Sequence, residues 1–238
     1  MTDILMLPMN PDLLVLGFVQ YVVFLLSTTC HEAAHALVAK LGGDMTAFEG
    51  GQATLNPLPH IKREPFGMVL MPLLGIISQS GLIGWASAPY DPLWSIRHPK
   101  RAGLMSLAGP ATNFAIAILA AMSMRIGLAM GIFTKGAITT SHIVGAPAGT
   151  ITEGVATVLS TFFTLNILLG LFNLLPFPPL DGYGALGLVT SENGARKLIE
   201  WRFKFRSVAI LGLVLGWRVV DQFYYPMLNT GLGLVYGF

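Results

Sequence analysis

The chain is dominated by long apolar segments. Five main blocks lie near residues 12–40, 66–88, 103–133, 151–175 and 206–225, and several approach or exceed the ~18–20 residues that span a bilayer. Only 11% of the 238 residues are charged, whereas about 25% are charged in a typical soluble domain. Because lipid offers no partner to backbone polar groups, spanning segments of this kind are helical. We therefore predict an all-α polytopic membrane protein.

The connecting segments predict a single domain, residues 1–238, with about five to six transmembrane helices. Residues 42–65 combine Gly, Thr, Asn and Pro, so we expect a small strand-like or re-entrant element after the first helix. Basic residues are densest at 191–206 and recur at 89–101, and the positive-inside rule would place both loops in the cytoplasm. Basic residues in the first connection compete with them, so the sequence leaves the membrane orientation open.

Composition also disfavours other classes of function. A net charge of +2 without a long basic run gives no nucleic-acid footprint. The single cysteine, Cys30, excludes an internal disulfide and a zinc site made of cysteines alone.

The first apolar block ends in a cluster of polar residues, HEAAH at 31–35. On a helix, residues four apart lie on one face, so His31 and His35 can bind one metal ion from consecutive turns. Glu32 lies where its carboxylate can reach a metal-bound water. This pattern is typical of Zn²⁺ with two imidazoles, a third protein ligand and an open position. If Lys40 marks the membrane surface, the two histidines lie about 8 Å and 13 Å from it along the helix.

The third ligand must come from another segment. The candidates are His60, His98, His142, Asp44, Glu49, Glu153 and Asp181. Most of these lie in loops, where a solvated polar residue needs no further explanation. Asp181 differs because apolar sequence flanks it on both sides and prolines break the preceding helix. Broken backbone at membrane depth occurs where it lines a cavity or is buried in protein. A proline-rich interfacial turn with a helix-capping Asp is the alternative interpretation.

Two motifs together resemble those of a known family. HEAAH and NLLPFPPLDG at 173–182 are similar to the motifs of the site-2 protease family of intramembrane zinc metalloproteases. GPATN at 109–113 resembles a further family motif that packs near the catalytic core. TLNPLPHI at 54–61 and GWASAPY at 84–90 resemble segments of compact members without PDZ or CBS domains. The resemblance covers residues 20–190.

This resemblance implies the roles of individual residues. It implies one zinc ion per chain, with His31, His35 and Asp181 as ligands and Glu32 as catalytic base. It also implies that Asn173 lies near the substrate carbonyl, where it polarises the carbonyl or stabilises the oxyanion.

We therefore expect a zinc endopeptidase that cleaves membrane-protein substrates within or next to their transmembrane segments, as in regulated intramembrane proteolysis. Its partners would be the substrate and the lipid bilayer, and its location the cell membrane of a prokaryote. The oligomeric state is left open. One alternative is a catalytically inactive scaffold or regulator of the same fold, which would not require Glu32. The other is a metal-ion transporter, which would be expected to carry further intramembrane acids or histidines.

Overall fold

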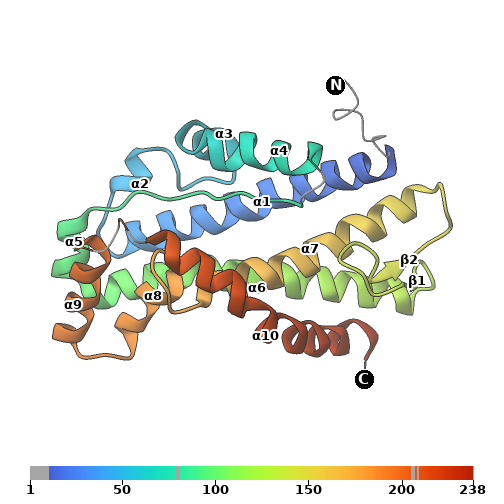
Figure 1. Cartoon of the computed structure of the whole chain (residues 1–238). Helices are drawn as coiled ribbons and strands as arrows, with labels where there is room; N and C mark the ends of the chain where they lie inside the picture. The colour runs from blue at the N-terminus through green and yellow to red at the C-terminus, as the bar shows by residue number, and fades with distance from the viewer. Residues whose placement is uncertain (1–10, 79–80, 205–206, 208, 238) are drawn as a thin grey trace.

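Three long helices form the centre of the molecule in the computed structural model, which describes residues 11–78, 81–204, 207 and 209–237 (Figure 1). They are α1 (Pro11–Leu41), α6 (Pro99–Ala129) and α7 (Ile151–Leu174). All three pack against one another. They are also the three helices among the described residues that are long and apolar enough to cross a membrane. The chain is therefore mostly helical, as predicted, but the count of five to six spans is not confirmed.

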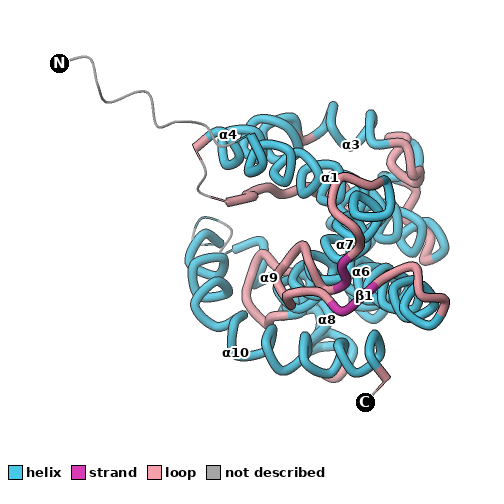
Figure 2. The backbone as a smooth tube through the Cα atoms, turned by 90° about the vertical axis from the view of Figure 1, so that its right-hand side faces the viewer, coloured by secondary structure: helices cyan, strands magenta, loops and turns pink. Residues whose placement is uncertain are grey.

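The remaining elements surround this centre. In Figure 2, α6 and α7 lie in the middle, with α3 and α4 above them and α10 below. A two-residue antiparallel pair of strands, in which Thr134 pairs with Gly145, lies at the end of the bundle opposite α5 and α9 (Figure 1). The bounds of the later elements are α5 (Pro92–Arg97), β1 (Thr134–Lys135), β2 (Val144–Gly145), α8 (Asp181–Ala185), η2 (Leu186–Leu188), α9 (Glu192–Lys204) and α10 (Ala209–Tyr236).

The prediction of a strand-like element at residues 42–65 is wrong. This segment forms two short helices, α2 (Thr46–Glu49) and α3 (Pro57–Arg63). The side chain of Asn56 accepts a hydrogen bond from the Leu58 amide at 3.0 Å, and Pro57 occupies the first helical position. Asn and Pro therefore act here as helix-start residues rather than as turn residues between strands.

The apolar block at 66–88 is not one spanning helix. A π-helical turn, η1 (Phe66–Leu70), continues into α4 (Met71–Ile77), and residues 81–91 then return as an extended segment. The Trp85 amide donates to the Gly67 carbonyl at 3.1 Å. A Cβ atom on Gly67 would lie 2.3 Å from the Trp85 carbonyl oxygen. Glycine is therefore required where the two arms of this element meet, and the element has the form of a re-entrant hairpin.

The main apolar core lies between α6, α7 and α10. Met124, Phe163 and Val235 are each 1% exposed or less and belong to one cluster of buried side chains. Ile143, beside the short strand β2, closes this cluster at the strand end of the bundle. A second, smaller cluster around Trp94 joins α5 to the end of α1, where the indole nitrogen donates to the Gly42 carbonyl at 3.0 Å.

Replacement of Gly67 by alanine tests the close approach of the hairpin arms. The added Cβ meets backbone rather than a movable side chain, so Gly67→Ala should destabilise the protein by about 1–3 kcal/mol, the range seen for overpacking. Thermal unfolding of the detergent-solubilised protein measures this. Gly154→Ala is the matched control, since nothing lies within 4 Å of its added Cβ. Equal melting temperatures for the Gly67→Ala variant and the unmodified protein would contradict the proposed contact.

Candidate metal centre

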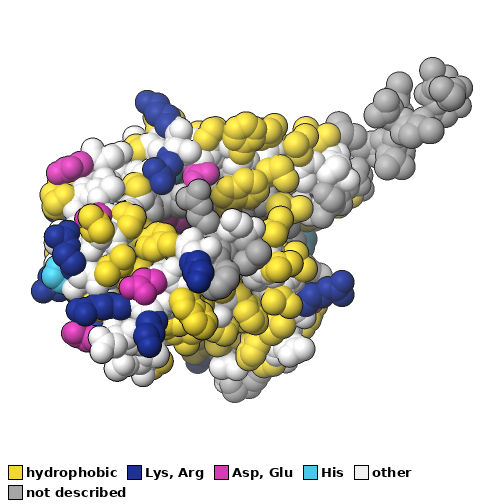
Figure 3. Space-filling view, turned by 60° about the vertical axis from the view of Figure 1, so that its left-hand side comes forward, with side chains coloured by type: hydrophobic (Ala, Val, Ile, Leu, Met, Phe, Trp, Pro, Cys, Tyr) yellow, Lys and Arg dark blue, Asp and Glu magenta, His cyan; other side chains and the backbone are white. Residues whose placement is uncertain are grey.

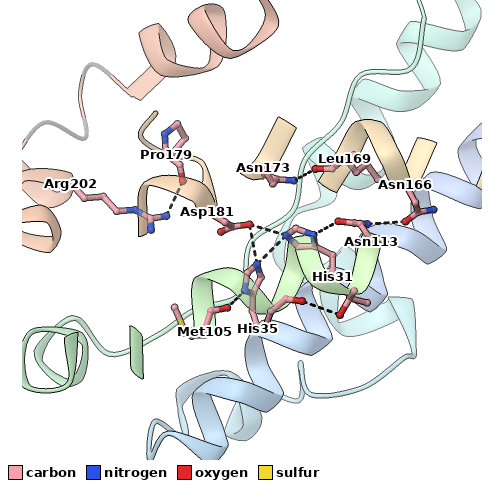
Figure 4. A network of polar contacts seen from close by, with 12 residues as sticks. His31, His35, Met105, Asn113, Asn166, Leu169, Asn173, Pro179, Asp181 and Arg202 are labelled. Atoms are coloured by element: carbon pink, nitrogen blue, oxygen red, sulfur yellow. Dashed lines mark hydrogen bonds and ion pairs between the residues drawn. The ribbon is translucent and has the colours of Figure 1, made fainter. Parts of the chain in front are cut away.

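Two histidines and one aspartate, from helices distant in sequence, meet inside the bundle (Figure 4). Nε2 of His31 lies 3.0 Å from Oδ2 of Asp181, and Nε2 of His35 lies 3.2 Å from the same oxygen. The two Nε2 atoms are 3.0 Å apart. This is the one group of three His, Cys, Asp or Glu donors found among the described residues, and two of its members are buried.

The outer ring nitrogens of both histidines are occupied. Nδ1 of His35 lies 2.7 Å from the Met105 carbonyl oxygen, which can only accept a hydrogen bond, so this nitrogen carries hydrogen. Nδ1 of His31 lies 2.6 Å from Oδ1 of Asn113 and donates to it in the same way. In the neutral form with hydrogen on Nδ1, each imidazole therefore directs an Nε2 lone pair toward the carboxylate and toward the other ring. Converging lone pairs of this kind need a positive charge between them.

A glycine leaves the space that a cation between these donor atoms requires. Gly109 of α6 faces the two imidazoles, and a Cβ atom there would lie 2.4 Å from the Nε2 atoms of both His31 and His35. The separations of the three donor atoms are close to the ~3.3 Å expected between zinc ligands in tetrahedral geometry. Two imidazoles and one carboxylate are also a ligand set that zinc takes in enzymes. The residues present therefore fit a zinc ion.

The chain matches a known protein family over most of its length. The model for "Peptidase family M50" matches residues 19–215. The chain belongs to this family. It is therefore a zinc metalloprotease of the site-2 type, and the family together with the long apolar helices makes it an integral membrane protein.

Curated relatives carry corresponding names. "Putative zinc metalloprotease YwhC" of Bacillus subtilis is 36% identical over 211 residues, which cover 88% of this chain and 85% of the relative. "Putative zinc metalloprotease Rip2" of Mycolicibacterium smegmatis is 34% identical over 79% of this chain and 64% of its own length. Rip2 of Mycobacterium tuberculosis strain Erdman is 32% identical over 82% of this chain and 67% of its own length. No solved structure gives a significant match.

The segment that carries Asp181 is held in place by its surroundings. Gly182 packs so closely against the end of α7 that a Cβ would lie 2.0 Å from the Leu174 carbonyl oxygen. Arg202 of α9 donates from Nη2 to the Pro179 carbonyl at 2.9 Å. Tyr183 donates from its hydroxyl to the Leu198 carbonyl at 3.2 Å. In this M50 protease, α7 and α9 therefore fix Asp181 opposite α1.

The two residues expected to act on the substrate lie beside this cluster. Glu32 precedes His35 by less than one turn of α1, is 5% exposed, and accepts no hydrogen bond from any residue that the structure describes. Asn173, near the end of α7, donates from Nδ2 to the Leu169 carbonyl at 3.1 Å. Its amide retains a second N–H, and Figure 4 draws no hydrogen bond between Asn173 and the three clustered residues.

The other candidate ligands have structural partners of their own. His60 is 1% exposed, and its Nε2 lies 3.1 Å from the Thr54 carbonyl. His98 packs against the Trp94 ring, and His142 lies 3.0 Å from the Ser141 hydroxyl. Asp44 accepts from Thr46 and from the Asp91 amide. Glu49 and Glu153 lie in the first turns of α2 and α7. None of these residues belongs to the cluster described above.

Two further groups that help to orient the candidate ligands lie outside the motifs HEAAH and NLLPFPPLDG. One is the Met105 carbonyl, which no side-chain pattern can reveal. The other is Asn166, which lies behind Asn113 and is fully buried. Asn166 did carry a signal, since it is an amide in the middle of the apolar run FFTLNILLG, and polar residues inside membrane helices are usually functional.

Removal of one carboxylate charge tests the centre. Asp181→Asn keeps the side-chain shape but removes the anionic ligand, so zinc affinity should fall by at least about 100-fold, the upper end of the losses seen for residues around metal ligands. Competition with a chromogenic chelator measures the affinity of the purified protein. Asp221→Asn on the exposed face of α10 serves as control and should bind zinc like the unmodified protein. Unchanged affinity in Asp181→Asn would rule out Asp181 as a ligand.

Proposed function

We propose that this M50 protease is an intramembrane endopeptidase that cleaves other membrane proteins within or next to their transmembrane segments. The single observation that carries this proposal is the position of the centre: His31, His35 and Asp181 meet between helices that are long and apolar enough to cross a membrane. A soluble protein segment would have to enter the bilayer to reach it, whereas a membrane-embedded substrate is already there.

The proposed chemistry divides between the metal ligands and two neighbouring side chains. A zinc ion, one per chain, would supply Lewis-acid chemistry that polarises the peptide carbonyl and acidifies a water molecule. His31, His35 and Asp181 would hold that ion. Glu32 accepts the proton of the attacking water and then donates it to the nitrogen of the departing amine as the C–N bond breaks. Asn173 donates its second amide N–H to the oxyanion of the carbonyl under attack.

A helical substrate hides its amides in hydrogen bonds, so the cleaved region must unwind and be held in extended form. We propose that the extended segment 81–91 binds it as an added strand. Among the described residues, Trp85 and Asp91 are the members of this segment that make backbone–backbone hydrogen bonds, which leaves other backbone groups to pair. Gly81 and Leu82 line a cavity of about 210 Å³, and Tyr90 lines a small pocket that also contacts Met105 and Gly184 beside the metal centre.

The charges support one orientation in the membrane. Lys40, Arg97, Lys100, Arg101 and the basic residues of α9 lie at the end of the bundle where α1 finishes and α6 begins. In Figure 3, charged side chains gather on the left of the molecule, and hydrophobic side chains cover much of the middle and right. By the positive-inside rule we propose that this end faces the cytoplasm.

The proposal extends to the cellular location of the protein and to the number of its intramembrane segments. Because the matched relatives come from bacteria, we propose the cell membrane of a prokaryote as the location. We also propose that α10 and the hairpin of η1 and α4 lie in the bilayer beside the three long helices, which gives five intramembrane segments in one domain.

Replacement of Glu32 by glutamine tests the mechanism. Glu32→Gln keeps the shape of the side chain but cannot accept the water proton, so it should bind zinc normally while cleavage falls by about 10²–10⁴-fold, the usual contribution of a general base. Comparison of membrane proteomes from cells with the unmodified and the Glu32→Gln protein should reveal substrates that accumulate uncut. Glu200→Gln on the exposed face of α9 is the control. Full cleavage by Glu32→Gln would refute the mechanism, and zinc binding without any substrate would favour an inactive scaffold.

Cysteine labelling tests the orientation. In a Cys30→Ala background, a membrane-impermeant maleimide added to whole cells should label Thr139→Cys, in the exposed connection between β1 and β2, but not Lys197→Cys on α9. After the cells are permeabilised, both variants should react. Labelling of Lys197→Cys alone in intact cells would reverse the proposed orientation.

A further inference from the structure

A chain of buried hydrogen bonds runs from the metal centre through all three long helices. Nδ1 of His31 on α1 donates to Oδ1 of Asn113 on α6, and Nδ2 of Asn113 donates to Oδ1 of Asn166 on α7 at 2.8 Å. Nδ2 of Asn166 donates to the Ser27 hydroxyl of α1 at 2.8 Å and to the Phe162 carbonyl at 2.9 Å. We propose that Asn166 is a positioning residue of the metal centre, which holds His31 in its metal-binding tautomer and orientation through Asn113. This rests on the proposed metal centre.

In this series of hydrogen bonds, one backbone carbonyl determines which group donates and which accepts at every step. The Phe162 oxygen can only accept, so the nitrogen of the Asn166 amide must face it, and Oδ1 of Asn166 must face Asn113. Asn113 then has to present Nδ2 to Asn166 and Oδ1 to His31. His31 consequently carries its hydrogen on Nδ1, and its Nε2 lone pair points toward Asp181 and His35.

No water is needed to complete this arrangement. Ser27, Asn113 and Asn166 are each 0% exposed. If the Asn113 amide turned over, its nitrogen would face the hydrogen of His31 Nδ1 and its oxygen would face Oδ1 of Asn166. Both contacts would then be repulsive, with no solvent to relieve them. Asn166 therefore excludes the inverted Asn113 amide, which is the rotamer that would favour the wrong histidine tautomer.

The two histidines are thus oriented by two different routes. His35 is fixed directly by the Met105 carbonyl of α6. Among the described residues, His31 has no backbone partner for Nδ1, and its orientation depends on two asparagine side chains in series. Groups of this kind around metal ligands typically contribute 10–100-fold to metal affinity. Because Asn166 acts through Asn113, we expect an effect near the lower end of this range.

Zinc affinity of purified variants tests the assignment. Asn166→Leu keeps the branching and the number of side-chain heavy atoms but removes both hydrogen-bonding functions, so zinc affinity should fall about 10-fold. The visible absorption of the Co²⁺-substituted protein should also change, because the orientation of one imidazole ligand changes. Asn166→Asp should restore both readouts: as a neutral acid, its carbonyl oxygen accepts from Asn113 while its hydroxyl donates to the Phe162 carbonyl.

Thr164→Val is the matched control. Thr164 lies on the same helix and is 3% exposed. Its hydroxyl donates to the Thr140 carbonyl at 2.5 Å, with the Ser160 carbonyl at 3.0 Å, and neither lies in the series of hydrogen bonds that leads to His31. Its replacement is isosteric and should lower thermal stability without changing zinc affinity. This comparison separates a general loss of α7 packing from a specific loss of ligand positioning. Should Asn166→Leu fail to fold, Asn166→Ser, which is too short to reach Asn113, gives the same test.

The outcomes are distinct. A folded Asn166→Leu or Asn166→Ser protein with unchanged zinc affinity and Co²⁺ spectrum would overturn the role of Asn166 and leave the proposed protease function intact. An equal loss of affinity in Thr164→Val would also overturn it. If the unmodified protein itself bound no zinc, the metal centre and the role of Asn166 would both be wrong.

Discussion

The structure depends on the convergence of two histidines and one aspartate inside a membrane protein. Two imidazole nitrogens and one carboxylate oxygen lie within 3.0–3.2 Å of one another, and the hydrogens of both imidazoles point outward. In water such groups would separate or bind solvent. Here α1, α6 and α8 keep them in place, so the packing of the helices maintains a site whose charge only a cation can balance. The helix packing that defines the fold therefore also creates the site that favours a metal ion.

Small residues make this packing possible. Gly109 lets α6 approach the two histidines, Gly182 lets α8 turn tightly against the end of α7, and Gly67 lets the hairpin arms meet. Between helices in lipid there is little hydrophobic gain, so close backbone approach and satisfied polar contacts must supply the association. The series of hydrogen bonds from His31 to Ser27 provides such contacts between α1, α6 and α7, next to the candidate metal ligands.

The sequence predicts the local parts of this arrangement and not the tertiary ones. His31 and His35 are four residues apart on one helix, so their pairing requires no knowledge of the fold. Asp181 could be favoured over the loop residues because of its apolar flanks, and the structure brings it to the two histidines. The sequence predicts one apolar block at 66–88, because its hydrophobicity is the same whether it continues as a helix or folds back. Contacts between the two arms, such as that between Gly67 and Trp85, distinguish the two. Asn166 depends likewise on a partner 53 positions away along the chain.

The two sides of the metal centre differ in a way that bears on catalysis. Behind His31, Asn113 and Asn166 are fully buried and hydrogen-bonded to each other, so this side is closed. Toward the front, the Asp181 side chain is 18% exposed, and the Glu32 carboxylate has no partner among the described residues. Structural zinc sites usually complete four protein ligands and exclude solvent, whereas catalytic sites keep one position open. Three protein donors, a closed side that fixes their orientation and an open side next to an unpaired carboxylate therefore correspond to a centre that performs hydrolysis.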